Sequence, residues 1–144
     1  KLNKLFSSTN SMNSTNPTNP TNSPPSTLLL VEDDADVRGI MVRHLTHRGF
    51  GVIVAADGME GLQKVEAGGF DLVITDIVMP YVSGVGIVST VKARSPEIPV
   101  IAITGYGQEP ESLAAESRAD LVLGKPVKMA DLIAHVRRLL EVPS

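Results

Sequence analysis

Residues 71–76 read Asp-Leu-Val-Ile-Thr-Asp, a short aliphatic run that ends in a hydroxyl and a carboxylate. Four other aliphatic runs occur along the chain, at 28–31, 51–54, 100–103 and 120–123. In all five, apolar residues follow one another directly, which is typical of strands covered on both faces in a parallel sheet. The sequence therefore predicts five buried parallel strands.

Helical periodicity separates these runs. Apolar residues recur at spacings of three and four in two stretches, 37–45 and 129–140, and Gly49 and Pro96 stand where helices are expected to end. Five strands that alternate with about five helices form a (βα)5 unit, and right-handed crossovers place helices on both faces of the sheet. We predict a doubly wound α/β fold with a five-stranded parallel sheet.

The composition limits this fold to one domain. The chain has 144 residues, of which 42% are hydrophobic, enough for a single core. Between Ser7 and Ser26 every residue except Met12 is Ser, Thr, Asn or Pro, a composition that cannot offset the entropy of ordering. We predict a disordered tail or linker over 1–26 and a folded domain over 27–144.

Charge and cysteine content exclude several classes of function. Removing Lys1 and Lys4 from the 13 basic residues leaves 11 in residues 27–144 against 16 acidic ones, a net charge of −5. Such a domain repels nucleic acid and anionic membranes, so we expect neither as a direct partner. The absence of cysteine excludes disulfides, thiolate nucleophiles and cysteine zinc sites. With no targeting segment or long apolar span, we expect a cytoplasmic location.

Polar side chains gather where the predicted strands end, the edge at which open α/β sheets bind ligands. Glu32-Asp33-Asp34 follows the first strand, Asp76 ends the third, Thr104 the fourth, and Lys125 follows the fifth. Hard carboxylate oxygens with room for water suit Mg²⁺ better than zinc. An ammonium and a hydroxyl beside them suit phosphoryl oxygens. A single acidic residue at a strand end is more often a helix cap, but the complete set predicts a site that handles phosphate.

This combination resembles the receiver domain of bacterial two-component response regulators, and the resemblance covers 27–144. It rests on Asp33-Asp34, Asp76 within residues 71–80, Gly84, Thr104 and Lys125-Pro126. The resemblance implies a flavodoxin-like, CheY-like fold. It also implies that Asp76 accepts a phosphoryl group from the phosphohistidine of a sensor histidine kinase or a histidine phosphotransfer protein.

The resemblance further implies a role for each site residue. Asp33, Asp76 and the backbone carbonyl of Val78 would bind Mg²⁺, with Asp34 acting directly or through water. Thr104 and Lys125 would hold phosphate oxygens. Such a domain is a regulatory phosphoacceptor that catalyses only its own phosphorylation and dephosphorylation, and is not an enzyme acting on a metabolite.

Two positions depart from the family pattern. The family usually has Tyr or Phe three residues before its lysine, and this chain has Val122 there. Its aromatic switch is therefore missing. Tyr106, two residues after Thr104, is a candidate substitute, and the alternative is a ring at the solvent edge.

Two other functions compete with this interpretation. A receiver-like docking module that is never phosphorylated has no physical reason to keep the complete acidic set together with Thr104 and Lys125. A small phosphatase that forms an aspartyl phosphate is disfavoured because Val78 stands where haloacid-dehalogenase-type phosphatases carry a second aspartate. The sequence names no downstream target. With no residues after Ser144, we expect the receiver to act alone or to be part of a longer protein such as a hybrid kinase.

The pair His44 and His47 is spaced so that both side chains could share a metal ion. His44 also continues the apolar stripe of Val37, Ile40 and Met41. We therefore expect His44 to be structural and His47 to face solvent.

Overall fold

The computed structural model describes residues 25–79, 83–105 and 118–141. The strands in these ranges are β1 (Thr27–Val31), β2 (Gly51–Ala55), β3 (Leu72–Asp76), β4 (Val100–Thr104) and β5 (Leu121–Gly124). The helices are α1 (Ala35–His47), α2 (Gly58–Ala67), α3 (Gly84–Arg94) and α5 (Met129–Leu140). The predicted tail, except for residues 25 and 26, and the interval 106–117 between β4 and β5 lie outside the described residues. None of the described helices has the length and apolar character needed to cross a membrane.

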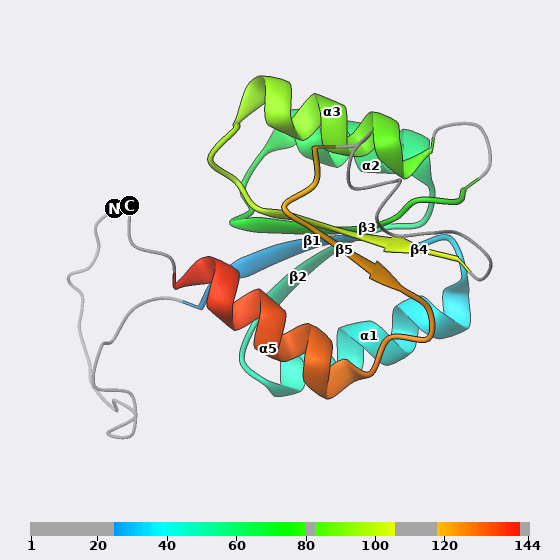
Figure 1. The fold of residues 1–144 in the computed structure, drawn as a ribbon, viewed down its shortest axis with the longest axis vertical. Coiled ribbons are helices and arrows are strands. Elements are labelled where there is room, and N and C mark those ends of the chain that lie inside the picture. The colour runs from blue at the N-terminus through cyan, green and yellow to red at the C-terminus, as the bar shows by residue number, and fades with distance from the viewer. Residues whose placement is uncertain (1–24, 80–82, 106–117, 142–144) are drawn as a thin grey trace.

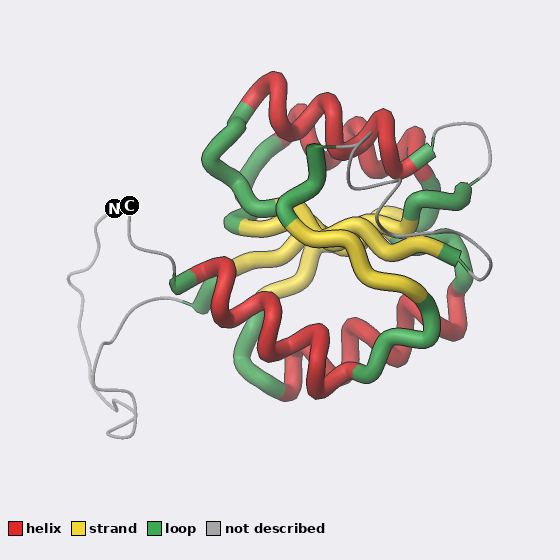
Figure 2. Tube along the Cα trace, in the orientation of Figure 1, coloured by secondary structure: helices red, strands yellow, loops and turns green. Residues whose placement is uncertain are grey.

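The five strands form one parallel sheet with the order β2-β1-β3-β4-β5. Figure 1 shows α1 and α5 on one face of this sheet and α2 and α3 on the other. Figure 2 shows the same three layers, with the sheet between two layers of helix. The predicted α/β fold with a five-stranded parallel sheet is confirmed, because helices cover both faces as right-handed crossovers require.

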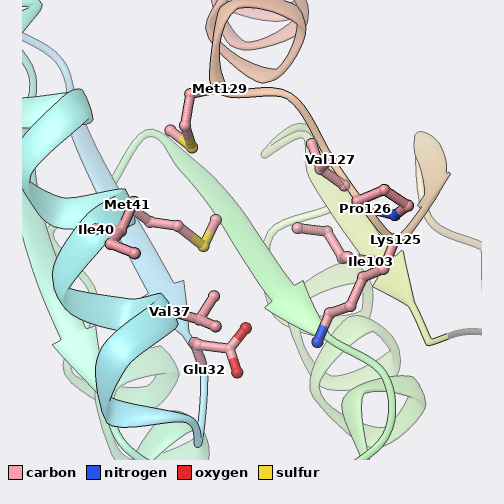
Figure 3. Close-up of a pocket in the computed structure, with 9 residues that line it drawn as sticks. All are labelled: Glu32, Val37, Ile40, Met41, Ile103, Lys125, Pro126, Val127 and Met129. Atoms are coloured by element: carbon pink, nitrogen blue, oxygen red, sulfur yellow. The ribbon is translucent and has the colours of Figure 1, made fainter.

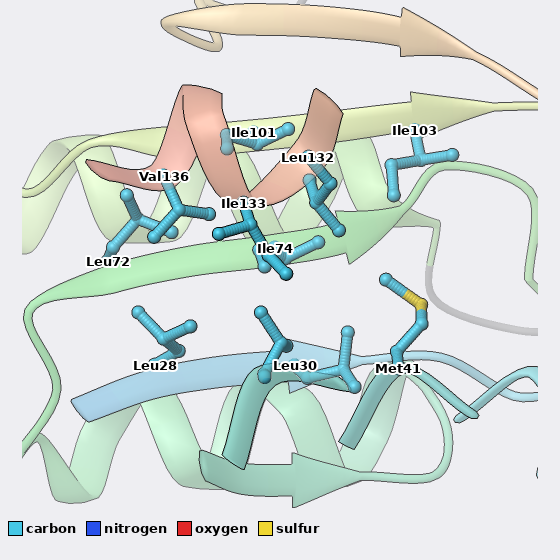
Figure 4. Packing of buried hydrophobic residues seen from close by; sticks show 11 residues of the cluster. Leu28, Leu30, Met41, Leu72, Ile74, Ile101, Ile103, Leu132, Ile133 and Val136 are labelled. Atoms are coloured by element: carbon cyan, nitrogen blue, oxygen red, sulfur yellow. The ribbon is translucent and has the colours of Figure 1, made fainter. Parts of the chain in front are cut away.

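Consecutive residues of the central strands pack into two different hydrophobic cores, one on each face of the sheet. On β1, Leu28 and Leu30 pack against α1 and α5 (Figure 4), whereas Leu29 and Val31 pack on the side of α2 and α3. All four side chains are buried. Because both faces of β1, β3 and β4 are covered, these strands are apolar at consecutive positions and do not alternate.

The two edge strands differ from the prediction of complete burial. Most residues of β2 and β5 are only half-buried, and Val54 is exposed. The reason is topological, since an edge strand has a neighbouring strand on one side only. The sheet order that makes β2 and β5 edges is not visible in their apolar sequences.

The buried face of α1 is narrower than its apolar stripe predicts. Met41 and Leu45 are buried, but Ile40 is 47% exposed and His44 is also exposed. The helix contacts the sheet along a spacing of four residues, so positions 40 and 44 rotate toward solvent. The expectation that His44 lies in the core stripe was wrong.

Candidate functional site

Strand register brings the predicted site residues to one edge of the sheet. Asp76 is paired with Ile103, so the next residue of β4, Thr104, lies just beyond Asp76 along the strand direction. Thr104 is in turn paired with Gly124, and the backbone N–H of Lys125 donates to the Thr104 carbonyl at 3.0 Å. Asp76, Thr104 and Lys125 therefore occupy successive strand ends, as the sequence predicted.

Three carboxylates converge at this edge. Single oxygen atoms from Glu32, Asp33 and Asp76 all lie within 4.8 Å of one another. The side chain of Asp33 is exposed, whereas Glu32 is 2% and Asp76 4% exposed. Two nearly buried carboxylates side by side are costly unless a cation or a proton compensates their charge. The cluster therefore favours binding of a cation.

Electrostatics at the cluster shift two pKa values. Burial raises the pKa of Glu32 to about 7, and the charges of Asp76 and Asp33 act in the same direction. The N–H of Asp34, which donates to Glu32 Oε2 at 3.1 Å, and the ammonium of Lys125 oppose this rise. Burial lowers the pKa of Lys125, but its hydrogen bond to Asp76 and the surrounding carboxylates outweigh burial and raise that pKa overall.

Lys125 supplies the cation nearest to Asp76. Its Nζ lies 3.2 Å from Oδ2 of Asp76, and its side chain is partly exposed. Figure 3 shows the Lys125 ammonium and the Glu32 carboxylate reaching into the same space from opposite sides. An ammonium on a flexible stem at this position can move from the carboxylate to an incoming phosphoryl oxygen.

Thr104 and Val78 are placed differently relative to Asp76. Thr104 is fully buried, and its hydroxyl donates to the Leu123 carbonyl at 3.4 Å, so a new acceptor at the site would compete with that bond. The Val78 N–H donates to Asp76 Oδ1 at 3.4 Å, a long hydrogen bond. The Val78 side chain is 54% exposed.

A cavity of about 460 Å³ opens over the cluster. Its lining is rich in charged residues and consists of Glu32, Asp33, Asp34, Asp76, Val78, Gly105 and Lys125. The donor set is made of hard oxygens with space for water, which fits a small divalent cation such as Mg²⁺ and does not fit a soft-ligand metal site. The same space can admit a phosphoryl group.

Asp34 caps a helix, and its predicted role at the ion, directly or through water, stays a prediction. Asp34 is the N-cap of α1, where its Oδ1 accepts from the N–H groups of Asp36 at 2.9 Å and Val37 at 3.0 Å. It reaches the cavity wall but is not among the three converging carboxylates, and Glu32 holds that position instead. The available signal was the helix start itself, because an aspartate directly before an amphipathic stretch is a strong N-cap candidate.

Gly84 allows the start of α3 to approach the backbone of Asp76. Its N–H donates to the Ile77 carbonyl at 2.9 Å, and a Cβ built on Gly84 would overlap the Asp76 carbonyl oxygen. Any side chain at this position would therefore displace the strand end that carries Asp76. This close contact explains a glycine as the first residue of α3.

Of the two predicted switch positions, the structure describes only Val122. Val122 is half-buried in β5 and is paired with Ala102, two residues before the strand end at Thr104. Tyr106 lies outside the described residues. The role of Tyr106 as a substitute for the missing aromatic stays a prediction.

Comparison with known proteins adds an independent finding. Residues 28–137 match the family described as response regulator receiver domain. The transcriptional activator protein PfeR of Pseudomonas aeruginosa is 36% identical over 118 residues, which cover 81% of this chain and 38% of PfeR. The transcriptional regulatory protein CusR of Escherichia coli is 36% identical over 114 residues, covering 78% of this chain and 50% of CusR. The chain thus spans half or less of the length of these two curated relatives.

Solved structures agree with the sequence comparison. A CheY-like response regulator receiver domain protein from Methanospirillum hungatei is similar with a TM-score of 0.76 and 29% identity, over 81% of this chain and 94% of that one. The response regulator TrrA of Thermotoga maritima, in complex with Mg²⁺-BeF, is similar with a TM-score of 0.72 and 28% identity, over 79% of this chain and 98% of that one.

Proposed function

Since the chain belongs to the family of response regulator receiver domains, we propose that it accepts a phosphoryl group on Asp76 during two-component signal transduction. The observation that carries this proposal is the placement of Asp76, whose nearly buried carboxylate pairs with the Lys125 ammonium and lies in one cluster with the carboxylates of Glu32 and Asp33. A carboxylate nucleophile in phosphoryl transfer needs nearby positive charge to offset its own charge and the charge on the phosphoryl oxygens.

The donor in this proposal is the phosphohistidine of a sensor histidine kinase or a histidine phosphotransfer protein. A carboxylate oxygen of Asp76 forms a bond to phosphorus while the phosphorus–nitrogen bond of phosphohistidine breaks. The imidazole leaves with the bonding electron pair and takes up a proton. The product is an acyl phosphate, and the reaction depends mainly on positioning and charge neutralisation.

Three groups divide that task. Lys125 moves with the charge from Asp76 Oδ2 to a phosphoryl oxygen, and the Thr104 hydroxyl exchanges its 3.4 Å bond to Leu123 for a second phosphoryl oxygen. We propose that Asp33, Asp76 and the Val78 carbonyl hold Mg²⁺, with Glu32, in place of Asp34, completing the acidic set. When bound, Mg²⁺ supplies positive charge beside the transferring oxygens. The Mg²⁺-BeF complex of the similar receiver TrrA supports this choice of ion.

The proposed output is regulatory. The domain, residues 27–144, modifies itself and turns over no metabolite, and phosphorylation changes a surface that a protein partner reads. Its exchange with an ATP-dependent kinase belongs in the cytoplasm. The names of the longer relatives, which are transcriptional regulators, suggest gene control as the context without specifying the target of this chain.

Intact-mass measurement after incubation with acetyl phosphate and Mg²⁺ tests the proposal. We expect a mass gain of one phosphoryl group that EDTA prevents and hydroxylamine removes, since hydroxylamine cleaves acyl phosphates and leaves serine or threonine phosphates intact. Asp76→Asn should abolish the gain. Asp36→Asn, an exposed aspartate outside the cavity lining, is the matched control and should label normally. An unlabelled wild-type protein that still binds Mg²⁺ would favour the docking module instead.

A further inference from the structure

The side chain of Arg38, near the start of α1, hydrogen-bonds to a backbone carbonyl. Its Nη1 donates to the backbone carbonyl of Glu32 at 2.8 Å, across six residues of chain. The side chain is half-buried. Within the described part of the chain, its guanidinium forms no ion pair with any carboxylate, although Glu32, Asp33 and Asp34 lie within six residues of it.

The carbonyl that Arg38 binds lies where the sheet ends. The N–H of Glu32 still donates to the Ala55 carbonyl at 3.1 Å and so continues the ladder between β1 and β2. The Glu32 carbonyl comes one step later, beyond the last paired residue of β1, and the structure gives it Arg38 as its donor. A nearly buried carbonyl at this place needs such a donor.

This contact determines the direction of the next carboxylate. The Glu32 carbonyl belongs to the peptide plane that joins Glu32 to Asp33, and this plane sets where the Asp33 side chain points. The Asp33 carboxylate accepts no hydrogen bond in the described residues, whereas the carboxylate of Asp34 is fixed by capping α1. Asp33 therefore depends on its backbone for its place in the cluster.

We propose that Arg38 is a positioning residue that fixes the Glu32–Asp33 peptide and so aims Asp33 at the divalent cation. This inference rests on the proposed function, because it concerns the same metal cluster. By binding a carbonyl, Arg38 stabilises the turn without occupying a carboxylate that the ion needs. Replacing an outer-shell partner that orients a ligand typically costs about 10- to 100-fold in metal affinity.

The direction in which metal affinity changes when Arg38 is replaced distinguishes this role from a purely electrostatic one. Arg38 is a positive charge near a cation site, so its removal should tighten divalent-ion binding if charge alone matters. If Arg38 positions Asp33, its removal should weaken binding. A purely structural role would lower thermal stability and leave the affinity for the ion unchanged.

The test measures Mn²⁺ affinity by electron paramagnetic resonance, with competition by Mg²⁺, together with thermal unfolding of the metal-free protein. Arg38→Met removes the donor and keeps the aliphatic stem, and we expect it to weaken Mn²⁺ binding about tenfold. Arg38→Gln, a second helix-compatible variant with a shorter side chain, should weaken it similarly. Arg38→Lys, which keeps a donor and the charge, should restore most of the affinity. Arg43→Met removes an equal charge from an exposed position on α1 and should bind as wild type.

Equal or tighter Mn²⁺ binding by Arg38→Met and Arg38→Gln, in a wild-type background that binds Mn²⁺ and is phosphorylated, would overturn the positioning role and leave the proposed function standing. A wild-type protein that binds neither Mn²⁺ nor Mg²⁺ would overturn both. Weaker binding in these two variants with recovery in Arg38→Lys supports the inference.

Discussion

The ammonium of Lys125 lies 3.2 Å from Oδ2 of Asp76, a carboxylate that is 4% exposed. One ammonium contacts a cluster that also contains Glu32 and Asp33, and the cluster therefore keeps an excess of negative charge. That excess explains two properties together. It favours a divalent cation, and it makes the metal-free protein sensitive to any change that adds or removes a charge at this edge of the sheet.

Replacing Lys125 by alanine should slow phosphorylation by acetyl phosphate about tenfold or more, because the group that follows the developing phosphoryl charge is lost. It should also lower metal-free stability by about 1–2 kcal/mol, since Asp76 is left nearly buried without its partner. Intact-mass measurement of samples quenched at successive times gives the phosphorylation rate, and urea unfolding gives the stability. Lys128→Ala, three residues further on at an exposed position, is the control, and an equal effect there would contradict a specific role for Lys125.

Asp76→Asn should abolish labelling and leave the fold intact. Removing this charge relieves repulsion from Glu32 and Asp33, so we expect thermal stability without Mg²⁺ to equal or exceed that of the wild type. Circular dichroism melting and intact mass provide both readouts. Stoichiometric acyl phosphate in Asp76→Asn would refute the assignment of the phosphoacceptor.

The contribution of Glu32 to the stability of the metal-free protein should fall as pH rises from about 4.5 through about 7. In the fold the pKa of Glu32 is raised from 4.5 to about 7, so the folded state retains a proton that the unfolded chain has released. The resulting stabilisation is fully present below about pH 4.5 and is lost by about pH 7, an effect on the order of 3 kcal/mol. Glu32→Gln should flatten this part of the stability profile and raise stability at pH 8. Identical pH profiles for Glu32→Gln and wild type in EDTA would rule out this origin.

The two aspartates after Glu32 should behave differently when each is replaced by alanine. Asp33→Ala should weaken Mg²⁺ binding at least about tenfold with little change in stability, because Asp33 is exposed and converges on the ion site. Asp34→Ala should cost about 1 kcal/mol of stability through loss of the α1 cap and affect Mg²⁺ much less. Calorimetric Mg²⁺ titration and urea unfolding distinguish the two, and a reversed pattern would restore Asp34 as the ligand.

The buried strands of this fold could be predicted from the sequence, but the order of the strands in the sheet could not. The consecutive apolar residues of 72–74 and 100–103 predicted buried parallel strands, because strands covered on both faces typically carry such runs. The same pattern could not show that β2 and β5 are edges, since sheet order depends on long-range pairing. The convergence of Asp33, Asp76 and Lys125 followed from the rule that ligands bind at the carboxyl ends of strands.

The remaining site details depend on atomic geometry. Glu32 and Asp34 are both acidic residues after a strand, and the sequence alone did not establish that Glu32 turns into the cluster while Asp34 caps α1. The contact between Arg38 and the Glu32 carbonyl spans six residues and follows no helical spacing, so no periodic signal indicates it. The Thr104 hydroxyl points to Leu123 because of its rotamer, which the residue type does not specify.

The lifetime of the phosphorylated state should depend on Val78. Its side chain is 54% exposed and lines the cavity beside Asp76, two residues further along the chain. Hydrolysis requires a water molecule in line with the bond that breaks, and an isopropyl group offers that water no hydrogen bond. We therefore expect slower loss of the phosphoryl group than in a variant with a small polar side chain at this position.

Val78→Asn should accelerate dephosphorylation, because an amide at the cavity mouth can orient the attacking water without touching the Asp76 nucleophile. The decay of the phosphorylated species is followed by intact mass after rapid removal of acetyl phosphate, with Mg²⁺ kept constant. Val54→Asn changes an exposed valine that does not line this cavity and should decay at the wild-type rate. The double variant Val78→Asn, Tyr106→Glu extends the test to the second predicted position, which lies outside the described residues. If neither variant decays faster than wild type, these side chains do not control access of water.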